Sequence, residues 1–385
     1  MGWLLLSVVC LAYWAAQALG SWLLWKVPQL SDVDPGSLDR WPKLSLVIPA
    51  RDEAEQIEAA VQSRLEDGYP DLEIVLVDDR STDGTSEIVD RLAASDPRVR
   101  ALHIRELPPG WLGKLNAMQR GLELTHGEWV LFTDADIHFR PGTLRRAMAL
   151  CQARGLDHLS VIPGIWPVGF LLDCVAATFL RSVALVARLW AVEDPKSKAA
   201  MGAGAFNLVR RSAFERTAGF EWLRLEAADD VALGQMLKRS GARSGVALGR
   251  DMVELPFSRT LNDVERSAEK SAGHFGFRIW PVFVAIGSLA VLELGPFALL
   301  PLPIWGPARI LAATAALVAI GTSIAACIRI GVRRFPAIFV PLGSAVFLVL
   351  MAKAATNAAL NKAVRWRGTS YSAEEILAGR RVALR

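Results

Sequence analysis

Cysteine, histidine and tyrosine are all scarce in this chain of 385 residues, which has 4, 5 and 3 of them. The four cysteines are widely separated, and no pair has the spacing of a zinc site or of a disulfide framework. The sequence therefore argues against a cysteine-based metal centre and a disulfide-stapled fold. It indicates a reducing, cytosolic setting for the middle of the chain.

Two other signatures are also missing. The run from Met201 to Phe206, MGAGAF, lacks the G-x-G-x-x-G spacing, so a dinucleotide cofactor is not expected. Its small residues instead allow the backbone to approach a ligand closely. Lys and Arg exceed Asp and Glu by only 43 to 39, and no basic stripe is interleaved with aromatic residues. Nucleic acid is therefore not an expected partner.

Long apolar runs lie at the two ends of the chain. Residues 3–25 carry no charge and are long enough to cross a bilayer. No basic segment precedes them, which favours a retained anchor over a cleaved signal peptide. Three more apolar runs lie at about 279–302, 308–328 and 336–359. We therefore predict a transmembrane anchor at 1–26, transmembrane segments within 277–360 and a basic tail at 361–385.

The sequence only partly determines how these segments are oriented in the membrane. The basic turn RIGVRR, residues 329–334, should be cytoplasmic by the positive-inside rule. Three spanning segments would then put the basic tail outside, so either one segment is re-entrant or the rule is violated. Residues 165–192 are apolar but carry Asp173, Arg181 and Arg188. They are equally compatible with an interfacial helix on the membrane and with a core helix.

Between the anchors, residues 40–275 should form the catalytic domain. The continuous apolar run at 44–49 is typical of a strand buried on both faces, and further strands are predicted at 72–79, 98–104 and 128–136. They alternate with amphipathic stretches at 53–65, 86–95 and 114–125. This alternation predicts an α/β fold, with a doubly wound, mostly parallel sheet and helices on both faces. In such sheets ligands bind beyond the carboxyl ends of the strands.

Acidic pairs stand at two of these strand ends. Asp78 and Asp79 close one strand, and Asp134 and Asp136 follow another. Aspartates at i and i+2 point to opposite faces of an extended strand, so a turn is needed before both reach one ligand. Carboxylate oxygens suit a hard divalent cation, Mg²⁺ or Mn²⁺, that also takes phosphate oxygens. A turn that is merely rich in aspartate is the simpler alternative.

The order of motifs narrows the interpretation. VIPARDEA precedes VDDRSTDGT, GKLNAMQRGLE, TDAD, GAGAFNLVRRSAFERTAGF and ADDVALGQML. This succession, over about residues 44–240, resembles family 2 glycosyltransferases of the GT-A fold. With ARDEA, RWRGTSY and the flanking apolar runs, it resembles the membrane-anchored branch of hopene-associated and ceramide-glucosyltransferase-like enzymes. The region 266–280 has no clear Q-x-x-R-W segment, which argues against a processive polysaccharide synthase. Arg266, Lys270, His274 and Arg278 could still offer positive charge to a diphosphate.

The resemblance implies a role for each acidic motif. Asp230 is the expected general base, with Asp229 beside it, although acids are also favoured in a first helical turn by the helix dipole alone. Asp134 and Asp136 are expected to hold Mg²⁺ or Mn²⁺, which neutralises charge on the departing diphosphate. Ser81 and Asp83 are expected to be capping and turn residues. The nucleotide-sugar ligands would be Asp52, Glu53, Asp78, Asp79, Lys114, Asn116 and Asp134.

Together these expectations describe an integral protein of the inner membrane with a cytoplasmic catalytic domain. It would move a sugar, with inversion, from a nucleotide sugar to a lipid hydroxyl, and the resemblance implies a UDP-sugar as the donor. A polyprenyl-phosphate glycosyltransferase and a polysaccharide synthase are alternatives with the same chemistry. A non-catalytic nucleotide-sugar-binding membrane protein is a third alternative. A transporter is not expected, because the C-terminal segments carry few ionisable residues beyond Glu293 and Lys353.

Overall fold

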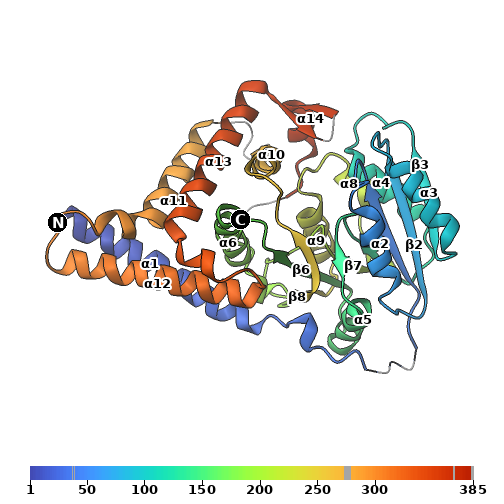
Figure 1. The fold of residues 1–385 in the computed structure, drawn as a ribbon, viewed down its shortest axis with the longest axis horizontal. Coiled ribbons are helices and arrows are strands. Elements are labelled where there is room, and N and C mark those ends of the chain that lie inside the picture. The colour runs from blue at the N-terminus through green and yellow to red at the C-terminus, as the bar shows by residue number, and fades with distance from the viewer. Residues whose placement is uncertain (37, 39, 273–278, 367–368, 383–385) are drawn as a thin grey trace. The chain divides into compact units, whose positions relative to one another are not determined.

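The computed structural model describes residues 1–36, 38, 40–272, 279–366 and 369–382 (Figure 1). The chain divides into two compact units. The sheet unit consists of Pro28–Gly164, Ala191–Leu255 and Glu374–Arg385, and the apolar unit consists of Met1–Val27, Ile165–Trp190 and Pro256–Ala373. His274 and Arg278, named above as sources of positive charge, lie outside the described residues.

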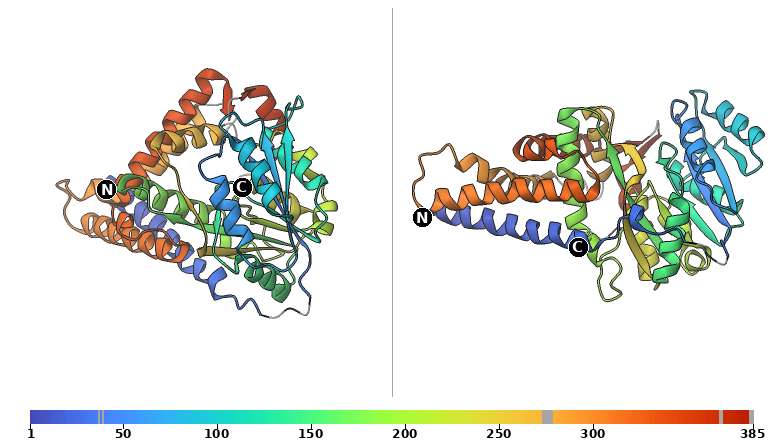
Figure 2. Two further views of the ribbon diagram at one scale, coloured as in Figure 1. Left: turned by 45° about the vertical axis from the view of Figure 1, so that its right-hand side comes forward. Right: turned by 60° about the horizontal axis from the view of Figure 1, so that its bottom comes forward.

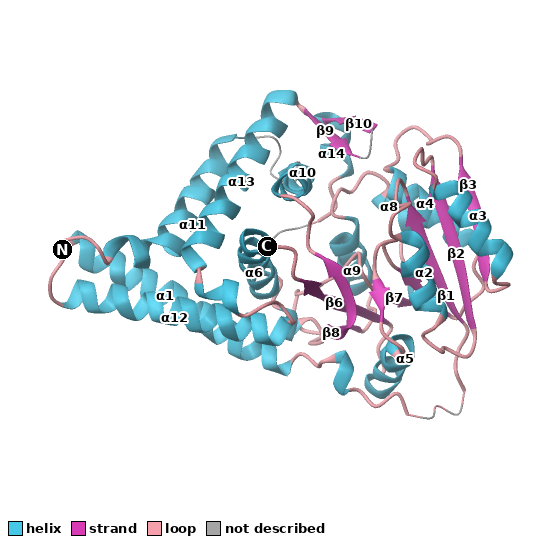
Figure 3. Cartoon of the chain, viewed as in Figure 1, coloured by secondary structure: helices cyan, strands magenta, loops and turns pink. Residues whose placement is uncertain are grey.

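The sheet unit is built on a mixed sheet with the strand order β3-β2-β1-β4-β7-β6-β8-β5. Figure 3 shows β3, β2 and β1 as neighbouring arrows. A separate hairpin in the apolar unit pairs β9 (Ala363–Trp366) with β10 (Thr369–Ser372). The strands of the large sheet are β1 (Leu44–Ala50), β2 (Leu72–Asp79), β3 (Val99–Ile104), β4 (Trp129–Phe132), β5 (His138–Phe139), β6 (His158–Trp166), β7 (Asn207–Arg210) and β8 (Ser244–Pro256).

The half of the sheet formed by β3, β2, β1 and β4 is parallel, as the sequence predicts. Every residue of β1 is buried, because its apolar side chains are covered on both faces. Strand β7 then runs antiparallel to β4, which makes the sheet mixed. The chain runs outward from β1 to β3 and returns to β4 on the other side of β1. The topological switch point, where ligands bind in such sheets, therefore lies at the carboxyl ends of β1 and β4.

Helices cover both faces of this sheet, as predicted. Helix α4 packs on β1 and β2, where a Cβ at Gly121 would lie only 2.6 Å from a methyl carbon of Val47. Helix α5 ends at Gly155, whose left-handed backbone (φ 59°) closes the last turn. The helices of the sheet unit are α2 (Ile57–Leu65), α3 (Thr85–Ser95), α4 (Gly113–Glu123), α5 (Thr143–Arg154), α7 (Arg211–Glu215), α8 (Gly219–Leu223), α9 (Asp229–Arg239) and α14 (Ala373–Gly379).

The apolar unit is helical, and α1 and α12 lie side by side within it (Figure 2). Five stretches among the described residues are long and apolar enough to cross a membrane: Gly2–Lys26, Phe170–Ala191, Ile279–Leu299, Pro307–Ile330 and Val340–Asn361. Four of them coincide with the predicted anchor and C-terminal segments. The helices of this unit are α1 (Gly2–Leu23), α6 (Phe170–Val186), α10 (Leu261–Ala272), α11 (Ile279–Leu299), α12 (Pro307–Ile330) and α13 (Val340–Asn361).

Helix α6 lies within the apolar unit, where it packs against α13. Its Arg181 is only 1% exposed and donates to a carboxylate oxygen of Glu293 on α11 at 2.7 Å. Tyr13 and Ser344 also donate to Glu293, at 2.5 and 2.8 Å. The charge of Arg181 is thus paired within the apolar unit, although its Nε and Nη1 atoms are buried without a hydrogen-bond partner in the part of the chain that the structure describes.

Candidate active site

A small cavity of about 10 Å³, roughly the space of one water molecule, is lined by charged residues from three segments of the sheet unit and by a glycine from a fourth. Lys114 comes from the first turn of α4, and Asp134 follows β4 at the switch point. Asp229 and Asp230 open α9, and Gly204 belongs to the loop before β7. The sequence predicted functional roles for these four charged residues separately, and the fold brings them together.

Lys114 is the electrostatic centre of this cluster. Its ammonium nitrogen lies 2.7 Å from an oxygen of Asp134 and 3.0 Å from an oxygen of Asp229. Burial disfavours the charged form, but Asp134, Asp229 and Asp230 outweigh it and raise the pKa of Lys114 above its ordinary value. The lysine therefore stays protonated and holds the two carboxylates close to each other.

Asp230 is held by the glycine-rich loop. One of its oxygens accepts the Gly204 N–H at 3.0 Å, and the other accepts the N–H of Val231 at 2.8 Å. The loop has no room for side chains here. A Cβ at Gly202 would lie 1.8 Å from the backbone oxygen of Asp230, and one at Gly204 would lie 2.6 Å from an oxygen of Asp134. The close backbone approach expected for MGAGAF is thus made to the acidic residues.

The turn after β4 is supported by a residue that the sequence analysis missed. Arg64 is fully buried on α2 and donates to the backbone oxygen of Asp134 at 2.5 Å. Burial lowers the pKa of Arg64 to about 10, although the charges of Asp136 and Asp134 oppose that shift. Arg64 occupies a helix that appears amphipathic in sequence, so nothing marked it as internal. Only the packing of α2 brings it to Asp134.

The acids after β1 and β2 form a second group, tied to their own loops. Asp78 is 1% exposed and accepts from the N–H of Ser81, from the hydroxyl of Ser86 and from His103. Burial alone would raise its pKa, but these hydrogen bonds lower it. Asp52 has a left-handed backbone (φ 55°) and accepts the Thr82 N–H at 2.8 Å. These contacts connect the two turns to each other.

Asp79 connects this second group to the start of α4. It is paired with Arg80 at 2.7 Å, and a Cβ at Gly113 would lie 2.3 Å from one of its oxygens. Asn116 is 5% exposed on the same helix, one residue beyond Leu115. The backbone N–H of Glu53 donates to Thr85. Asp83 accepts from Thr85 and Ala54, which fits the turn role expected of it.

His103 is the second residue that the sequence analysis missed. Its ring nitrogens lie 3.0 Å from an oxygen of Asp78 and 2.9 Å from an oxygen of Asp90. The parallel register places His103 of β3 directly beside Asp78 of β2. The sequence could have indicated this contact, because His103 stands near the end of the strand that follows β2 and the carboxyl ends of parallel strands meet at one edge of the sheet.

The predicted cation site can be compared with these carboxylates. Among the described residues, no group of three or more His, Cys, Asp or Glu side chains is arranged to hold a metal ion. Asp134 and Asp136 alone offer only two carboxylates. That number is still compatible with Mg²⁺ or Mn²⁺ in nucleotide sites, where phosphates and water complete the coordination. The chemistry of this donor set therefore fits the predicted ion.

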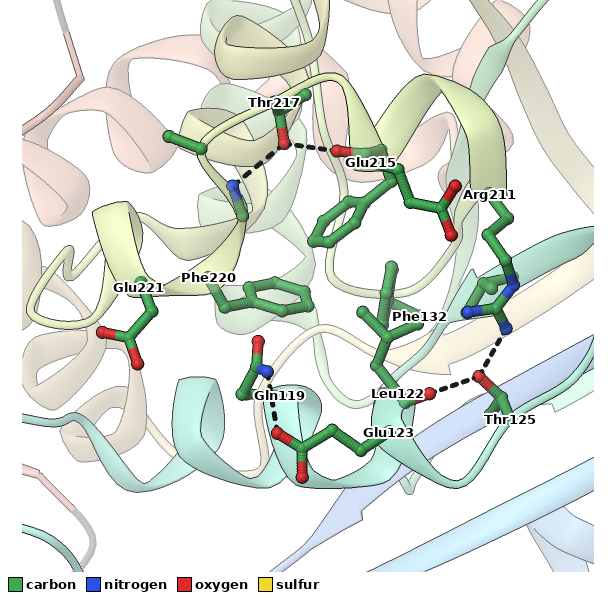
Figure 4. A pocket seen from close by; sticks show the side chains of 14 residues that line it. Gln119, Leu122, Glu123, Thr125, Phe132, Arg211, Glu215, Thr217, Phe220 and Glu221 are labelled. Atoms are coloured by element: carbon green, nitrogen blue, oxygen red, sulfur yellow. Dashed lines mark hydrogen bonds between the residues drawn. The ribbon is translucent and has the colours of Figure 1, made fainter.

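A roomier cavity of about 420 Å³ (Figure 4) shares Phe132 with the small cavity as a lining residue. Its wall includes Phe214 and Phe220, and Gln119 and Glu123 reach it from α4. Glu215 and Glu221 also line it. Lys114, Asp134, Asp229 and Asp230 all line the smaller cavity instead. The charged cluster therefore lines the smaller of the two cavities and not the larger one.

The comparisons with known proteins agree with this geometry. Residues 45–168 match the family described as Glycosyl transferase family 2. The chain carries a family 2 glycosyltransferase domain. The match contains Asp78, Lys114 and Asp134, whereas Asp229 and Asp230 lie beyond its end.

Curated relatives match part of this chain. It is 34% identical over 135 residues to the succinoglycan biosynthesis protein ExoO of Rhizobium meliloti, covering 34% of this chain and 37% of that protein. It is 33% identical over 107 residues to the GalNAc(5)-diNAcBac-PP-undecaprenol beta-1,3-glucosyltransferase of Campylobacter jejuni, covering 28% and 34%. The chain thus spans about a third of the length of these relatives.

Among solved structures, the mannosyltransferase PcManGT of Pyrobaculum calidifontis has a similar fold. The similarity covers 92% of this chain and 99% of that one, with a TM-score of 0.58 and 20% identity. At this identity the comparison concerns the fold alone, and it confirms the predicted GT-A architecture. The family 2 resemblance is confirmed over residues 45–168, and the fold predicted from the sequence is confirmed. The roles of the individual site residues stay predictions.

Proposed function

We propose that this glycosyltransferase transfers a sugar, with inversion, from a nucleotide sugar to a lipid hydroxyl at the cytoplasmic face of the inner membrane. The observation that carries the proposal is the convergence of Asp134, Asp229 and Asp230 around Lys114 at the switch point of the sheet. Such sheets bind ligands at this point. The cluster combines the ammonium group of Lys114 with a predicted metal ligand, Asp134, and the predicted general base, Asp230.

Asp230 is proposed as the general base. Its carboxylate stands in the first turn of α9, where the helix dipole stabilises negative charge. The N–H of Gly204 fixes one oxygen, so the carboxylate keeps one orientation toward an acceptor hydroxyl. A base of this kind takes a proton while the hydroxyl oxygen attacks the anomeric carbon. A single displacement without a carboxylate nucleophile inverts that carbon, as the family resemblance implies.

Asp134 and Asp136 are proposed to hold the divalent cation. When bound, Mg²⁺ or Mn²⁺ would neutralise the negative charge on the departing nucleoside diphosphate. Two basic residues hold Asp134: Arg64 donates to its backbone oxygen, and Lys114 pairs with its carboxylate. Both contacts hold Asp134 in place before the donor arrives, which is the preorganisation that electrostatic catalysis requires.

The donor is proposed to be a UDP-sugar. Asp52, Glu53, Asp78 and Asp79 would face the nucleoside, and Lys114 and Asn116 would lie nearer the ribose and diphosphate. The structure of PcManGT is described as a complex with GDP-Man and Mn²⁺. GDP-mannose is therefore the first competitor to include when donors are compared, and Mn²⁺ is the first metal to supply.

The acceptor is proposed to be a hydroxyl group carried by a lipid. One relative is named for transfer onto a PP-undecaprenol-linked acceptor. Hydrophobic stretches long enough to span a bilayer tether this enzyme where such acceptors are found. A hyaluronan synthase is also among the relatives, at 32% identity over 130 residues that cover 12% of that protein. Single-sugar transfer and polymer extension are separated by the size of the product.

Chain connectivity supports one membrane arrangement. The chain leaves the sheet unit at Gly164 and re-enters it at Ala191, with only α6 between. A folded polar unit occupies one side of a membrane, so a single helix between two of its parts cannot cross alone. We therefore propose that α6 stays on the catalytic side.

The same argument applies to the C-terminal helices. The chain leaves the sheet unit at Leu255 and returns at Glu374, so α11, α12 and α13 must cross an even number of times. The basic turn at 329–334 favours α11 and α12 as the crossing pair. Helix α13 makes polar contacts with the polar face of α10, through Lys353 to Glu265 at 2.6 Å and Asn357 to Glu269 at 2.8 Å. It is proposed to stay at the cytoplasmic interface, with the tail inside.

The test uses the full chain, purified in detergent and supplied with radiolabelled UDP-sugars, GDP-mannose and a membrane lipid extract. We expect one nucleotide sugar to label the lipid fraction in the presence of Mn²⁺ or Mg²⁺, and EDTA to abolish the labelling. Labelled lipid that persists in EDTA would remove the role given to Asp134 and Asp136. Release of nucleotide without any labelled product would contradict the transfer reaction itself.

The membrane arrangement has a separate test. A cysteine at Trp305, which is 80% exposed in the loop between α11 and α12, is compared with one at the exposed Leu377 of α14. A membrane-impermeant maleimide should label the first only in right-side-out vesicles and the second only in inverted ones. Labelling of both from the same side would contradict the arrangement.

A further inference from the structure

Glu226 is a buried acid that the proposed reaction does not use. It is fully buried, three residues before Asp229, in the connection between α8 and α9. Its carboxylate accepts the backbone N–H of Ala228 at 2.9 Å. It also accepts the backbone N–H groups of Arg381 and Val382, at 2.5 and 2.9 Å. A buried carboxylate is costly unless such donors surround it, so its place depends on the far end of the chain.

The C-terminal segment makes further contacts along the same connection. Arg381 donates from Nε to the backbone oxygen of Trp222 at 3.0 Å, and its guanidinium carbon lies 5.5 Å from the centre of the Trp222 ring. Gly379 is packed so closely that a Cβ would lie 2.3 Å from the Cβ of Leu225. Ile376 and Val382 are also buried. Residues 376–382 are therefore seated along 222–226, and we name them the C-terminal clip.

The connection under the clip leads directly into the charged cluster. Arg224 accepts, on its backbone oxygen, the N–H of Leu112 at 2.7 Å, two residues before Lys114. At its other end the connection enters α9 at Asp229. Helix α9 begins after Ala228 with no side-chain cap of its own, and the nearby N–H of Ala228 is taken by Glu226. The same short connection thus fixes the starts of both helices that supply Lys114, Asp229 and Asp230.

From these contacts we infer that Glu226 and the C-terminal clip position Asp229 and Asp230 for catalysis. The clip acts through the connection rather than on the reactants, so Glu226 is a positioning residue. The inference rests on the proposed function, since it assigns the clip to the same site. It predicts that loosening the clip lowers the rate of the chemical step while the donor still binds.

Two substitutions in the full chain test this inference, each with a matched control. Glu226→Gln replaces the carboxylate that accepts the N–H groups of Arg381 and Val382 by a weaker, neutral acceptor. Glu374→Gln makes the same change at an exposed position of α14. Gly379→Val pushes the clip away from Leu225, and Ala378→Val places the same side chain at the exposed neighbour. Thermal unfolding of each purified protein shows whether the fold is kept.

The main readouts are kcat, the KM for the donor and backbone hydrogen exchange over 222–232. We expect both test variants to lower kcat by about tenfold or more, because a small misplacement of catalytic groups has effects of that order. The donor KM should change much less than kcat, since Asp52 and Asp78 are held by contacts in their own loops, which the clip does not touch. Exchange over 222–232 should become faster in the test variants, whereas both controls should match the wild type.

Hydrogen exchange tests the clip independently of the proposed function, because the measurement needs no substrate. If the wild type transfers no sugar but the test variants exchange faster over 222–232, the clip stands as a structural device and the proposed function fails. If the wild type is active and both test variants keep its kcat and its exchange rates, the inference is overturned. If Gly379→Val does not fold, Glu226→Gln and its control decide the outcome alone.

Discussion

Lys114 and Asp229 form an ion pair of 3.0 Å, and the same ammonium group lies 2.7 Å from Asp134. One lysine thus bridges the acid that follows β4 and the acid that opens α9. Asp134 is a predicted metal ligand, and Asp229 lies next to Asp230, the predicted general base. The common contact of Asp134 and Asp229 makes the lysine the link between the two halves of the proposed reaction.

Replacing this lysine should therefore affect both halves. In Lys114→Met, the two carboxylates lose the positive charge between them, and we expect kcat/KM to fall by about a hundredfold or more, as for other groups that act electrostatically. The free energy of unfolding should also fall, by about 3–5 kcal/mol, because the Asp229 side chain is only 7% exposed and would lose its charged partner. Steady-state kinetics and urea unfolding measure the two effects.

Lys198→Met is the matched control, since Lys198 is exposed and does not line the small cavity. It should leave both kcat/KM and stability close to the wild type. Wild-type kinetics in Lys114→Met would show that the ion pair has no part in the reaction, whatever the stability measurement gives.

The glycine-rich loop gives a second prediction. A Cβ at Gly204 would lie 2.6 Å from an oxygen of Asp134 and 3.3 Å from the Lys114 nitrogen. Gly204→Ala should therefore displace this ion pair and lower kcat by about tenfold to a hundredfold while the protein stays folded. Gly321→Ala, in α12 where no atom lies within 4 Å of the added carbon, is the control. Equal activity of the two variants would contradict the close approach seen in the structure.

Local patterns predicted much of this fold from the sequence. The continuous apolar runs of β1 and β2 and the amphipathic pattern of α4 depend on neighbouring residues, so they could be recognised along the chain. Asp78 and Asp134 were identified because they end such runs. Each of these features is encoded within a few residues of itself.

Other features depend on contacts between distant parts of the sequence. Arg64 looked like a solvent-facing helix residue, and only the packing of α2 brings it to the backbone of Asp134. The sequence left α6 compatible with both an interfacial helix and a core helix, and only the fold shows that Arg181 pairs with Glu293 on α11. Glu226 receives Arg381 and Val382 from the far end of the chain. No spacing rule joins such residues, because the three-dimensional fold alone sets their distance.

His103 gives a prediction about pH. Burial disfavours its charged form, but the hydrogen bonds and charges of Asp78 and Asp90 outweigh burial and raise the pKa of His103 above its ordinary 6.5. The folded protein then binds this proton more tightly than the unfolded chain does. The stabilisation is complete below about pH 6.5, the unfolded value, and is lost as the pH rises through the raised pKa of the folded state.

Thermal unfolding of the wild type and of His103→Gln at several pH values measures this effect. The wild type should be more stable than the variant by about 1 kcal/mol near pH 6, the scale of one hydrogen-bonded pair, and the difference should shrink toward pH 9. His126→Gln, at a histidine whose side chain is 65% exposed, should show no comparable trend. A difference that grows with pH would contradict the assigned direction of the shift.

A substitution of Asp230 distinguishes a lipid hydroxyl acceptor from the main alternative, a polyprenyl phosphate. A lipid hydroxyl must lose a proton as it attacks, and a positioned base contributes about a hundredfold to ten-thousandfold to such a step. Asp230→Asn keeps the size of the side chain and an oxygen for the Gly204 N–H, but it removes the base. We therefore expect kcat to fall within that range while the donor KM stays close to the wild-type value. Asp71→Asn, at an exposed position before β2, should leave kcat unchanged. An acceptor phosphate is already ionised and needs no base, so high activity in Asp230→Asn would reject the lipid hydroxyl and favour a polyprenyl phosphate.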